Sequence, residues 1–377
     1  MRIAFVSNVV YPFVTGGAEK RIYEIGRRLE RDGHDVTIYG RHYWDGPQET
    51  NQEGMTLRAV SDGRDLYTDD RRSIPEAVEF AVRALRPLRR HRDEHDVFVA
   101  SVFPYFPVFS TALARLRTDT PLVTTWHEVW LDYWDEYLGS LAFGGKAVER
   151  LTAAVPQHPI AVSRNTADRL AQIGPEREDI AVVPNGIDYK HIRNVAPTES
   201  GYDVLFVGRL IEDKRVDLLL RAFDRLAHDH DLTLGVIGDG PEAERLRQLA
   251  ESLDTSDRID FLGFVEDHDD VLAQMRTASV FASPSTREGF GITAVEAMAA
   301  GCTVVAADHP ESAVAEVVGD AGILVEPTVD GVERGLRRAL DTNPTPTAPE
   351  TRAKRFDWDT VAEQALDRYA SAVHSTW

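Results

Sequence analysis

The chain has 377 residues, of which 43% are hydrophobic, and a formal net charge of −20 from 42 basic and 62 acidic residues. This length exceeds that of one ordinary core and predicts two domains. The acidic balance argues against general nucleic-acid binding, which needs a basic face. Arginine has largely replaced lysine, and we interpret this acidic, arginine-rich composition as that of a protein from a halophile. The five lysines are Lys20, Lys146, Lys190, Lys214 and Lys354.

The sequence also indicates the cellular compartment in which the protein works. A single cysteine, Cys302, excludes an internal disulfide and indicates a reducing compartment. The sequence has no apolar run of the roughly 18–20 residues that a membrane span requires, and its first ten residues are too short and too β-like for a signal peptide. We therefore expect a cytoplasmic protein, with peripheral contact at the inner face of a membrane as a further prediction.

The first half of the chain alternates predicted strands and helices. Residues 2–8 are a short apolar run that ends at a polar turn, as a buried parallel strand does. A helix is expected over 18–34, where Ile22, Ile25 and Leu29 recur at helical spacing, and a second strand follows. Strand, helix, strand in this order is a βαβ unit. The strands expected after the first are 35–40, 96–102, 121–128, 159–164 and 180–188.

A second series of the same kind follows the loop-like stretch 189–202. Two such series predict an α/β protein with two doubly wound, Rossmann-like domains facing a cleft, where ligands bind at the carboxyl ends of the strands. The expected strands are 203–210, 232–240, 259–265, 278–285, 302–308 and 322–327, and the expected helices are 216–229 and 242–253. The predicted divisions are a first Rossmann-like domain at 1–187, a hinge at 188–202, a second Rossmann-like domain at 203–355, and a helix at 356–377 that packs back toward the first domain.

The stretch from Arg287 to Gly301 places Glu288 and Glu296 around a turn with two glycines, just before a predicted helix. Glycine lets the backbone approach a ligand closely, and the free amides at a helix N-terminus favour an anion such as phosphate. The alternative is a plain helix end whose glutamates only offset the dipole. A purely structural cap would favour Ser, Thr, Asp or Asn. We therefore favour a ligand site, in which Glu296 accepts ribose hydroxyls and Glu288 accepts sugar hydroxyls.

A bound diphosphate would need cations. Arg209 and Lys214 follow the first strand of the same domain, and an arginine fork with a lysine point charge suits a diphosphate. The alternative is a pair of surface cations, but a chain that has nearly eliminated lysine keeps one at this place. Gly16 and Gly17 form a comparable turn before the first helix of the other domain.

Six segments occur in order along almost the whole chain: TGGAEKRIYEIGRRLERDGHDVTIYG, VPNGID, VGRLIEDKRVDLLLRAF, VIGDGPEAERL, FLGFV and SPSTREGFGITAVEAMAAG. Together they resemble the large retaining GT-B glycosyltransferase family (glycosyl transferases group 1), which includes α-mannosyl- and α-glucosyltransferases and sucrose-synthase-like enzymes. The Glu-x7-Glu element is the most specific part of the resemblance. The resemblance implies a hexosyltransferase that uses a UDP-, GDP- or ADP-sugar, with a glycan or lipid-linked acceptor, in polysaccharide or glycoconjugate biosynthesis. It also implies that residues 1–187 form the acceptor-side domain and residues 203–355 the nucleotide-sugar-binding domain.

The resemblance also implies roles for single residues. Glu296 would bind the ribose, and Glu288 the transferred sugar. Arg209 and Lys214 would hold the diphosphate, and His127, after a strand of the first domain, would contact the donor sugar. Relatives often have Asp next to this histidine, whereas this chain has Glu128. The remaining expected donor contacts are Gly16, Gly17, Gly238, Val265, Gly289, Phe290, Gly291, Ile292 and Thr293.

No convincing nucleophile or metal site stands out, and no metal cofactor is expected. Asp-x-Asp triplets occur at Asp229–Asp231, Asp267–Asp269 and Asp357–Asp359, but we attribute them to chance in an Asp-rich chain and expect none of them to follow a strand at the cleft. The family implies that the acceptor proton passes to the leaving phosphate. Two other functions stay open: a non-catalytic sugar-nucleotide-binding module, and a dinucleotide oxidoreductase, for which the G-x-G-x-x-G fingerprint after a strand is missing.

The acceptor side carries the weakest signals. Trp126, Trp130 and Trp134 lie four apart, which fits core packing as well as it fits sugar stacking or an interfacial lipid contact. An arginine-rich stretch, 83–92, stands out on an acidic chain. It fits a solvated face or a contact with anionic lipid headgroups. Its arginines are Arg83, Arg86, Arg89, Arg90 and Arg92.

Overall fold

The computed structural model describes the chain except residues 15, 65–66, 69–70, 73, 342–344 and 376–377. It divides the chain into two compact units, and we call them unit 1 (Met1–Pro184 with Trp358–Trp377) and unit 2 (Asn185–Asp357). The chain therefore crosses between the units twice, and the last helix belongs to unit 1. The stretch 188–202, expected as a hinge, lies in unit 2 and contains helix α7 (Tyr189–Asn194).

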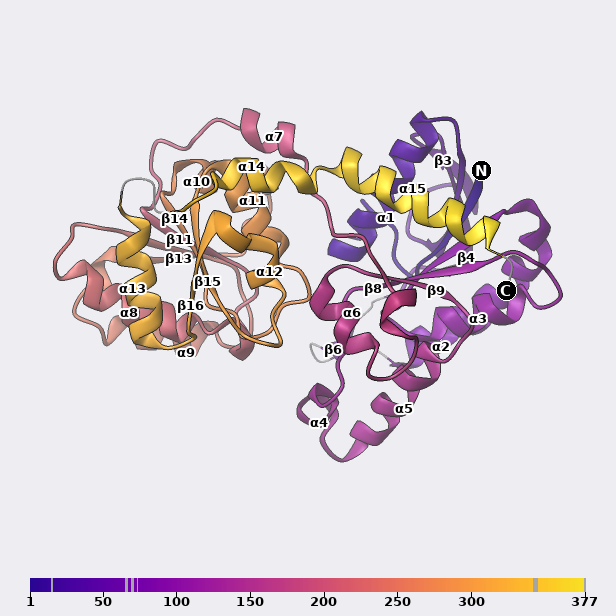
Figure 1. Cartoon of the computed structure of the whole chain (residues 1–377), viewed down its shortest axis with the longest axis horizontal. Helices are drawn as coiled ribbons and strands as arrows, with labels where there is room; N and C mark the ends of the chain where they lie inside the picture. The colour runs from indigo at the N-terminus through magenta and orange to yellow at the C-terminus, as the bar shows by residue number, and fades with distance from the viewer. Residues whose placement is uncertain (15, 65–66, 69–70, 73, 342–344, 376–377) are drawn as a thin grey trace. The chain divides into compact units, whose positions relative to one another are not determined.

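Unit 1 is built on an eight-stranded sheet in the order β10-β9-β8-β7-β1-β2-β4-β3, parallel except for the antiparallel pair β3–β4 (Figure 1). Its strands are β1 (Arg2–Val6), β2 (Asp35–His42), β3 (Glu49–Gln52), β4 (Met55–Asp62), β7 (Val97–Ser101), β8 (Leu122–Trp126), β9 (His158–Ala161) and β10 (Ala181–Val182), with a separate pair β5 (Tyr67–Thr68) and β6 (Arg71–Arg72). Its helices are α1 (Gly17–Arg31), α2 (Ile74–His91), α3 (Phe106–Ala114), α4 (Tyr133–Leu138), α5 (Ala142–Ala153), α6 (Arg164–Leu170) and α15 (Trp358–His374), with single 3₁₀ turns at η1 (Arg92–Glu94), η2 (Gly139–Leu141) and η3 (Arg177–Asp179).

Each face of this sheet has its own core, because successive side chains of a strand point to opposite faces. Ile3 and Phe5 of β1 pack into one core with residues of α1 and α15. Ala4 and Val6 pack into the other core, which α2 and α3 cover. Both faces are buried, which is why the predicted strands are continuous apolar runs.

Unit 2 holds a six-stranded, fully parallel sheet in the order β13-β12-β11-β14-β15-β16. Its strands are β11 (Val204–Val207), β12 (Leu234–Ile237), β13 (Ile259–Gly263), β14 (Val280–Ser283), β15 (Thr303–Ala307) and β16 (Gly322–Val325). Besides α7, its helices are α8 (Val216–Ala227), α9 (Ala243–Glu251), α10 (His268–Thr277), α11 (Ile292–Ala300), α12 (Val314–Val318), α13 (Val329–Ala339) and α14 (Pro349–Ala353), with 3₁₀ turns at η4 (Glu212–Lys214), η5 (Ser256–Arg258), η6 (Gly319–Ala321) and η7 (Lys354–Phe356). Every predicted strand of both series is present, so the two Rossmann-like sheets are confirmed.

Candidate functional site

The candidate donor site lies where the connections of the unit 2 sheet change sides. Strands β11 and β14 are neighbours. Helix α8, after β11, packs with α9 and α13, whereas α11, after β14, packs with α10 and α14. The two loops therefore leave adjacent strand ends toward opposite faces, and ligands of open α/β sheets bind at such a switch point.

These two loops bring Lys214 and Glu288 together. Lys214 ends the turn η4 after β11, Glu288 lies in the loop after β14, and the Lys214 ammonium donates to the Glu288 carboxylate. The loops are also joined by the backbone, since the Thr286 amide donates to the Asp213 carbonyl at 2.9 Å. The structure thus places a mostly buried cation and carboxylate in contact, from residues 74 positions apart in the sequence.

Glu288 has a fixed backbone. The Ala313 amide donates to the Glu288 carbonyl at 2.8 Å, and Glu288 forms a parallel bridge with Ser312. The loop before α12 therefore holds the backbone of Glu288 in place. Because its backbone is anchored, the carboxylate is presented with little freedom, as a binding or catalytic group needs.

Glu296 lies in the second turn of α11 and is only 4% exposed. Its Oε1 is 3.0 Å from Nε2 of His268, the first residue of α10. His268 is half exposed, so this pair joins a buried carboxylate to the surface. Sequence reasoning missed His268, although it lies only three residues after Val265, which was assigned to the base.

The turn between the two glutamates ends in a left-handed residue. Gly291 has φ +88° at the N-cap of α11, and a Cβ there would lie 2.7 Å from Val314 Cγ2. Gly291 has no side chain with which to cap this helix, and the first amides of α11, at Ile292 and Thr293, have no intrahelical acceptor because of their position in the first turn. The Phe290 ring is buried edge-on against Phe356, so only the backbone of Phe290 is available for a ligand. Gly289 is half-buried in the same turn.

Three glycines, Gly208, Gly238 and Gly263, allow the backbone to pack closely at the carboxyl ends of β11, β12 and β13. Gly238 has φ +134°, and a Cβ there would lie 1.9 Å from the Gly208 carbonyl oxygen. The Gly238 amide donates to the Gly263 carbonyl at 2.8 Å. Backbone packing alone therefore requires glycine at 238, whatever the ligand. Val265, two residues beyond Gly263, is half-buried at the same edge of the sheet.

Arg209 lies two residues after the end of β11 and is exposed. Among the residues that the structure describes, its side chain makes no ion pair or hydrogen bond. An unneutralised guanidinium at the carboxyl edge of the sheet, five residues before Lys214, suits an anionic ligand.

Unit 1 holds the other predicted glycine turn. Gly16 is the extended N-cap of α1 and, as a glycine, has no side chain with which to cap this helix. A Cβ on Gly16 would lie 2.5 Å from Oε1 of Glu19, which is buried below the turn. Gly17, the first helical residue, is exposed. The amides that begin α1 therefore have the geometry of an anion-binding turn.

His127 follows β8, also in unit 1. It lines a small cavity with Arg21, Ser101 and Tyr369, and the Ser101 hydroxyl is buried there without a partner among the described residues. Burial, and next the positive charge of Arg21, lower the pKa of His127 to about 3. The imidazole is therefore neutral at any ordinary pH, and it can donate or accept a hydrogen bond but is not a cation.

Arg21 also anchors the end of unit 1. Its guanidinium donates to the carbonyls of Val183, at 3.1 Å, and of Pro184. Pro184 is the last residue before the chain enters unit 2. Burial lowers the pKa of Arg21 to about 10, a value at which the guanidinium keeps its charge at neutral pH. One arginine of α1 thus connects the His127 cavity to the chain segment that leaves unit 1.

The tryptophans near His127 are mainly structural. Trp126 is fully buried and its indole donates to Gln157 Oε1 at 3.2 Å. Trp130 packs against Trp134 with ring centroids 4.7 Å apart. The buried Glu149 carboxylate accepts from the Trp130 amide at 2.7 Å. Core packing is therefore the interpretation that the structure supports. Glu128, whose role was open, accepts from the Trp130 indole at 3.0 Å.

One expectation about the Asp triplets was wrong. Asp267–Asp269 does follow a strand at the carboxyl edge of the sheet, because it begins α10 after β13. There, Asp267 caps α10 by accepting from the Asp269 amide at 2.9 Å, and Asp269 pairs with His191 at 2.6 Å. Within the described part of the chain, no cluster of three or more His, Cys, Asp or Glu side chains is arranged to hold a metal ion.

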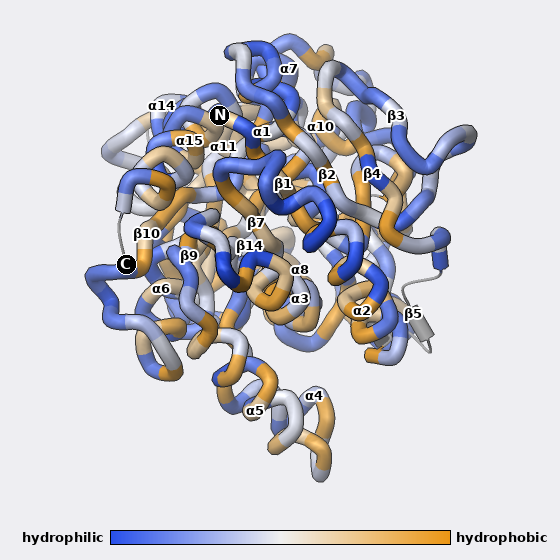
Figure 2. Tube along the Cα trace, turned by 90° about the vertical axis from the view of Figure 1, so that its right-hand side faces the viewer, coloured by the Kyte–Doolittle hydropathy of each residue, from blue (hydrophilic) through white to orange (hydrophobic). Residues whose placement is uncertain are grey.

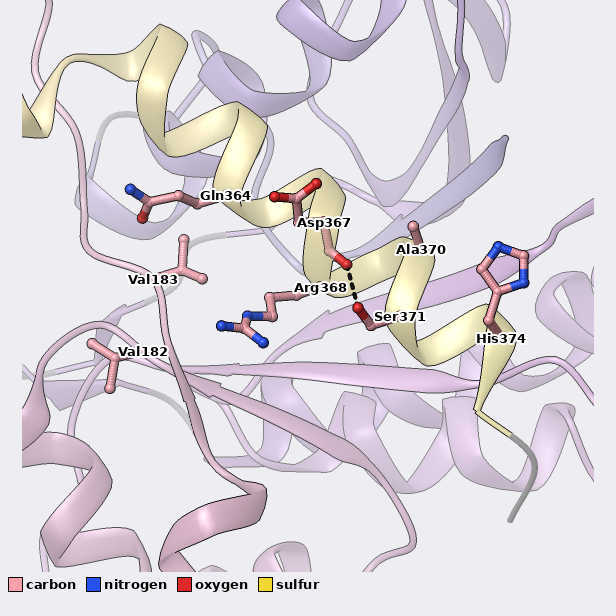
Figure 3. Close-up of a pocket in the computed structure, with 8 residues that line it drawn as sticks. All are labelled: Val182, Val183, Gln364, Asp367, Arg368, Ala370, Ser371 and His374. Atoms are coloured by element: carbon pink, nitrogen blue, oxygen red, sulfur yellow. Dashed lines mark hydrogen bonds between the residues drawn. The ribbon is translucent and has the colours of Figure 1, made fainter.

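A separate hollow lies in unit 1 beside α15 (Figure 3). Arg368 points across it toward Val182 and Val183, whereas His374 lies at the far end of the helix. Its one drawn hydrogen bond is internal to α15, from Ser371 Oγ to the Asp367 carbonyl at 2.7 Å. The hollow contains none of the predicted site residues.

Comparison with known proteins supports the assignment of the two units. Residues 15–191 match the model of Glycosyltransferase Family 4, and residues 189–356 match that of Glycosyl transferases group 1. The chain is a GT-B glycosyltransferase. The two matches overlap at residues 189–191, and together they cover residues 15–356, which include every strand of both Rossmann-like sheets except β1.

Individual relatives agree with this family. The glycosyltransferase is 28% identical to a glycogen synthase of Mycobacterium tuberculosis over 99% of its own length and 95% of the relative's. It is 29% identical to a phosphatidyl-myo-inositol mannosyltransferase of Mycolicibacterium smegmatis over 98% and 93%. In fold it resembles the Anabaena protein HepE in complex with UDP, with a TM-score of 0.74 and 22% identity over 98% of this chain and 100% of the other.

Proposed function

We propose that the chain transfers a hexose, with retention of anomeric configuration and without a metal ion, from a nucleotide-diphosphate sugar to a hydroxyl group of a glycan or lipid-linked acceptor. The observation that carries this proposal is the contact of Lys214 with Glu288 at the switch point of unit 2. In this contact a cation suited to phosphate lies beside a carboxylate suited to sugar hydroxyls. Both belong to the loops near the N-terminus of α11, whose first amides have no intrahelical acceptor. The relatives named for glycogen synthesis and for lipid mannosylation, and the fold shared with a UDP complex, support it.

In the proposed reaction the bond between the anomeric carbon and the leaving phosphate oxygen breaks, and its electron pair goes to the diphosphate. Lys214, Arg209 and the amides of Ile292 and Thr293 stabilise the charge that develops there. The acceptor oxygen forms the new bond on the same face of the sugar, and its proton passes to the leaving phosphate oxygen. Glu288 stabilises positive charge at the anomeric carbon. Glu296 holds the ribose, and neutral His127 contacts the sugar.

A thermal-shift panel of UDP, GDP, ADP and NAD tests the donor class. A nucleotide present at about 100 times its dissociation constant is expected to add about 2.7 kcal/mol to the free energy of unfolding. Stabilisation by one of the first three nucleotides, followed by turnover of a sugar nucleotide built on it, supports the proposal. Stabilisation by NAD alone would favour an oxidoreductase. Tight nucleotide binding with no turnover of any matching donor would favour a binding module.

Chelation tests the metal-free part of the proposal. We expect EDTA to leave turnover unchanged, because cationic side chains and helix amides, all supplied by the chain, stabilise the leaving diphosphate. The measurement is the initial rate with the matching donor for untreated enzyme and for enzyme that has been passed through a chelating column and assayed in EDTA. Loss of activity that Mn²⁺ or Mg²⁺ restores would overturn the metal-free mechanism.

A further inference from the structure

Helix α2 presents an unusual outer side. Its inner side is buried on the sheet through residues such as Phe80, Ala84 and Leu88. The outer side exposes aliphatic residues, with Val82 69% exposed, among arginines. Figure 2 shows this mixture of hydrophilic and hydrophobic positions along α2. The exposed arginines are Arg83, Arg86, Arg89 and Arg90.

The end of α3 adds to the same surface. Helices α2 and α3 pack together, and Arg92, just after α2, donates to the Leu116 carbonyl at 2.9 Å. Leu113 is 52% exposed and Leu116 60%. Of the 11 large hydrophobic residues exposed in the described part of the chain, five lie on α2 or at the end of α3: Ile74, Val78, Val82, Leu113 and Leu116. We call the surface formed by Val78, Val82, Arg86, Arg89, Arg90, Leu113 and Leu116 the α2–α3 face.

The charge of the α2–α3 face is opposite to that of the chain. Residues 80–92 contain five arginines and no Asp or Glu, in a chain of net charge −20. Arg83 is paired with Glu79 at 2.7 Å. Arg86, Arg89 and Arg90 form no ion pair with another described residue, and their spacings of three and four place like charges side by side on the helix, which destabilises it. An anionic surface would relieve this repulsion.

The aliphatic residues decide which anionic partner fits. A nucleic acid offers phosphates but no apolar phase for exposed Val and Leu side chains. A membrane surface offers both, since interfacial helices bury aliphatic side chains at the boundary of the acyl chains while arginines contact anionic headgroups. We propose that the α2–α3 face binds an anionic membrane surface. This proposal is independent of the proposed reaction, because the face contains none of the predicted donor-site residues.

Flotation of the full chain with vesicles tests it. We expect strong binding to vesicles that contain phosphatidylglycerol and only weak binding to pure phosphatidylcholine, where the aliphatic side chains act without headgroup attraction. The triple variant R86Q/R89Q/R90Q is expected to weaken partitioning to anionic vesicles by roughly a hundredfold. The matched control R221Q/R245Q/R334Q, which changes exposed arginines of unit 2 by the same charge, is expected to bind as the wild type does.

The aliphatic contribution is measured separately. The double variant V82S/L116S is expected to weaken binding at about 0.1 M salt and to abolish the residual binding that survives at about 1 M salt, where headgroup attraction is screened. Nucleotide thermal shifts of every variant check that the chain is folded and that the donor site is unaffected. Equal binding to both vesicle types, equal loss in the two arginine triples, or arginine-dependent binding to duplex RNA without vesicle binding would each overturn the proposal.

Discussion

Replacing Lys214 or Arg209 with alanine is expected to lower kcat/KM by at least about a hundredfold, the scale of removing one oriented charge-stabilising group. Lys214 already contacts Glu288, and Arg209 lies exposed on the same edge of the sheet. Both cations are therefore available where the leaving diphosphate is proposed to bind. The measurement is steady-state kinetics with saturating acceptor, beside Lys190→Ala and Arg334→Ala as exposed controls outside the site.

The two variants are expected to differ in stability. Lys214→Ala leaves a mostly buried Glu288 carboxylate without its cation, which costs folding free energy as well as activity. Arg209→Ala breaks no ion pair among the described residues, so its melting temperature is expected to match that of the wild type. A large kinetic loss in Arg209→Ala therefore reports on catalysis alone. Activity within a few-fold of wild type in both variants would refute the diphosphate assignment.

The second large effect is a difference between the Glu296 and Glu288 variants in nucleotide affinity and in turnover. Glu296→Gln is expected to weaken the free nucleotide and the sugar nucleotide alike, by about 1.5–3 kcal/mol, because ribose is common to both and a charged hydrogen bond is lost. Glutamine keeps the volume of this buried side chain and an oxygen that can face His268, which limits the effect on folding. Calorimetry of free nucleotide binding measures it.

Glu288→Gln is expected to leave free nucleotide affinity nearly unchanged and to depress single-turnover rates. In the proposed site its carboxylate contacts the transferred sugar and no part of the nucleotide, and its contribution grows with positive charge at the anomeric carbon. The substitution also releases Lys214 from its ion pair, so phosphate binding has no reason to fall. If both variants lost nucleotide affinity equally, or neither did, the glutamates would only end a helix and the site assignment would fail.

The strands and the donor loops were predictable because their signals are local. A parallel strand buried on both faces is an uninterrupted apolar run, and Gly291 stands where a positive φ precedes a helix. Other elements lack such a signal. Strand β3 (Glu49–Gln52) is entirely polar because it lies at the sheet edge, and α2 contains Pro87 and an arginine-rich end. These two elements were missed.

Contacts between distant segments were also out of reach of the sequence. His268 meets Glu296 only because α10 and α11 pack with a particular register, which no spacing in the sequence encodes. The tryptophans gave a clear sequence signal with two interpretations, since their four-residue spacing fits a core and a ligand surface equally well. Burial of Trp126 and Trp134 resolved it.

The second crossing between the units affects how the protein is made. Unit 2 is one continuous segment, Asn185–Asp357, and can fold as soon as it leaves the ribosome. Unit 1 is the first to be synthesised but the last to be completed, because Trp358, Val361 and Tyr369 of α15 fill the core that holds Phe5. Until α15 has been synthesised, the face of the central sheet that α1 and α15 cover together is covered by α1 alone. Unit 1 therefore exposes apolar side chains of its core, of the kind that chaperones bind, after all of unit 2 has been synthesised.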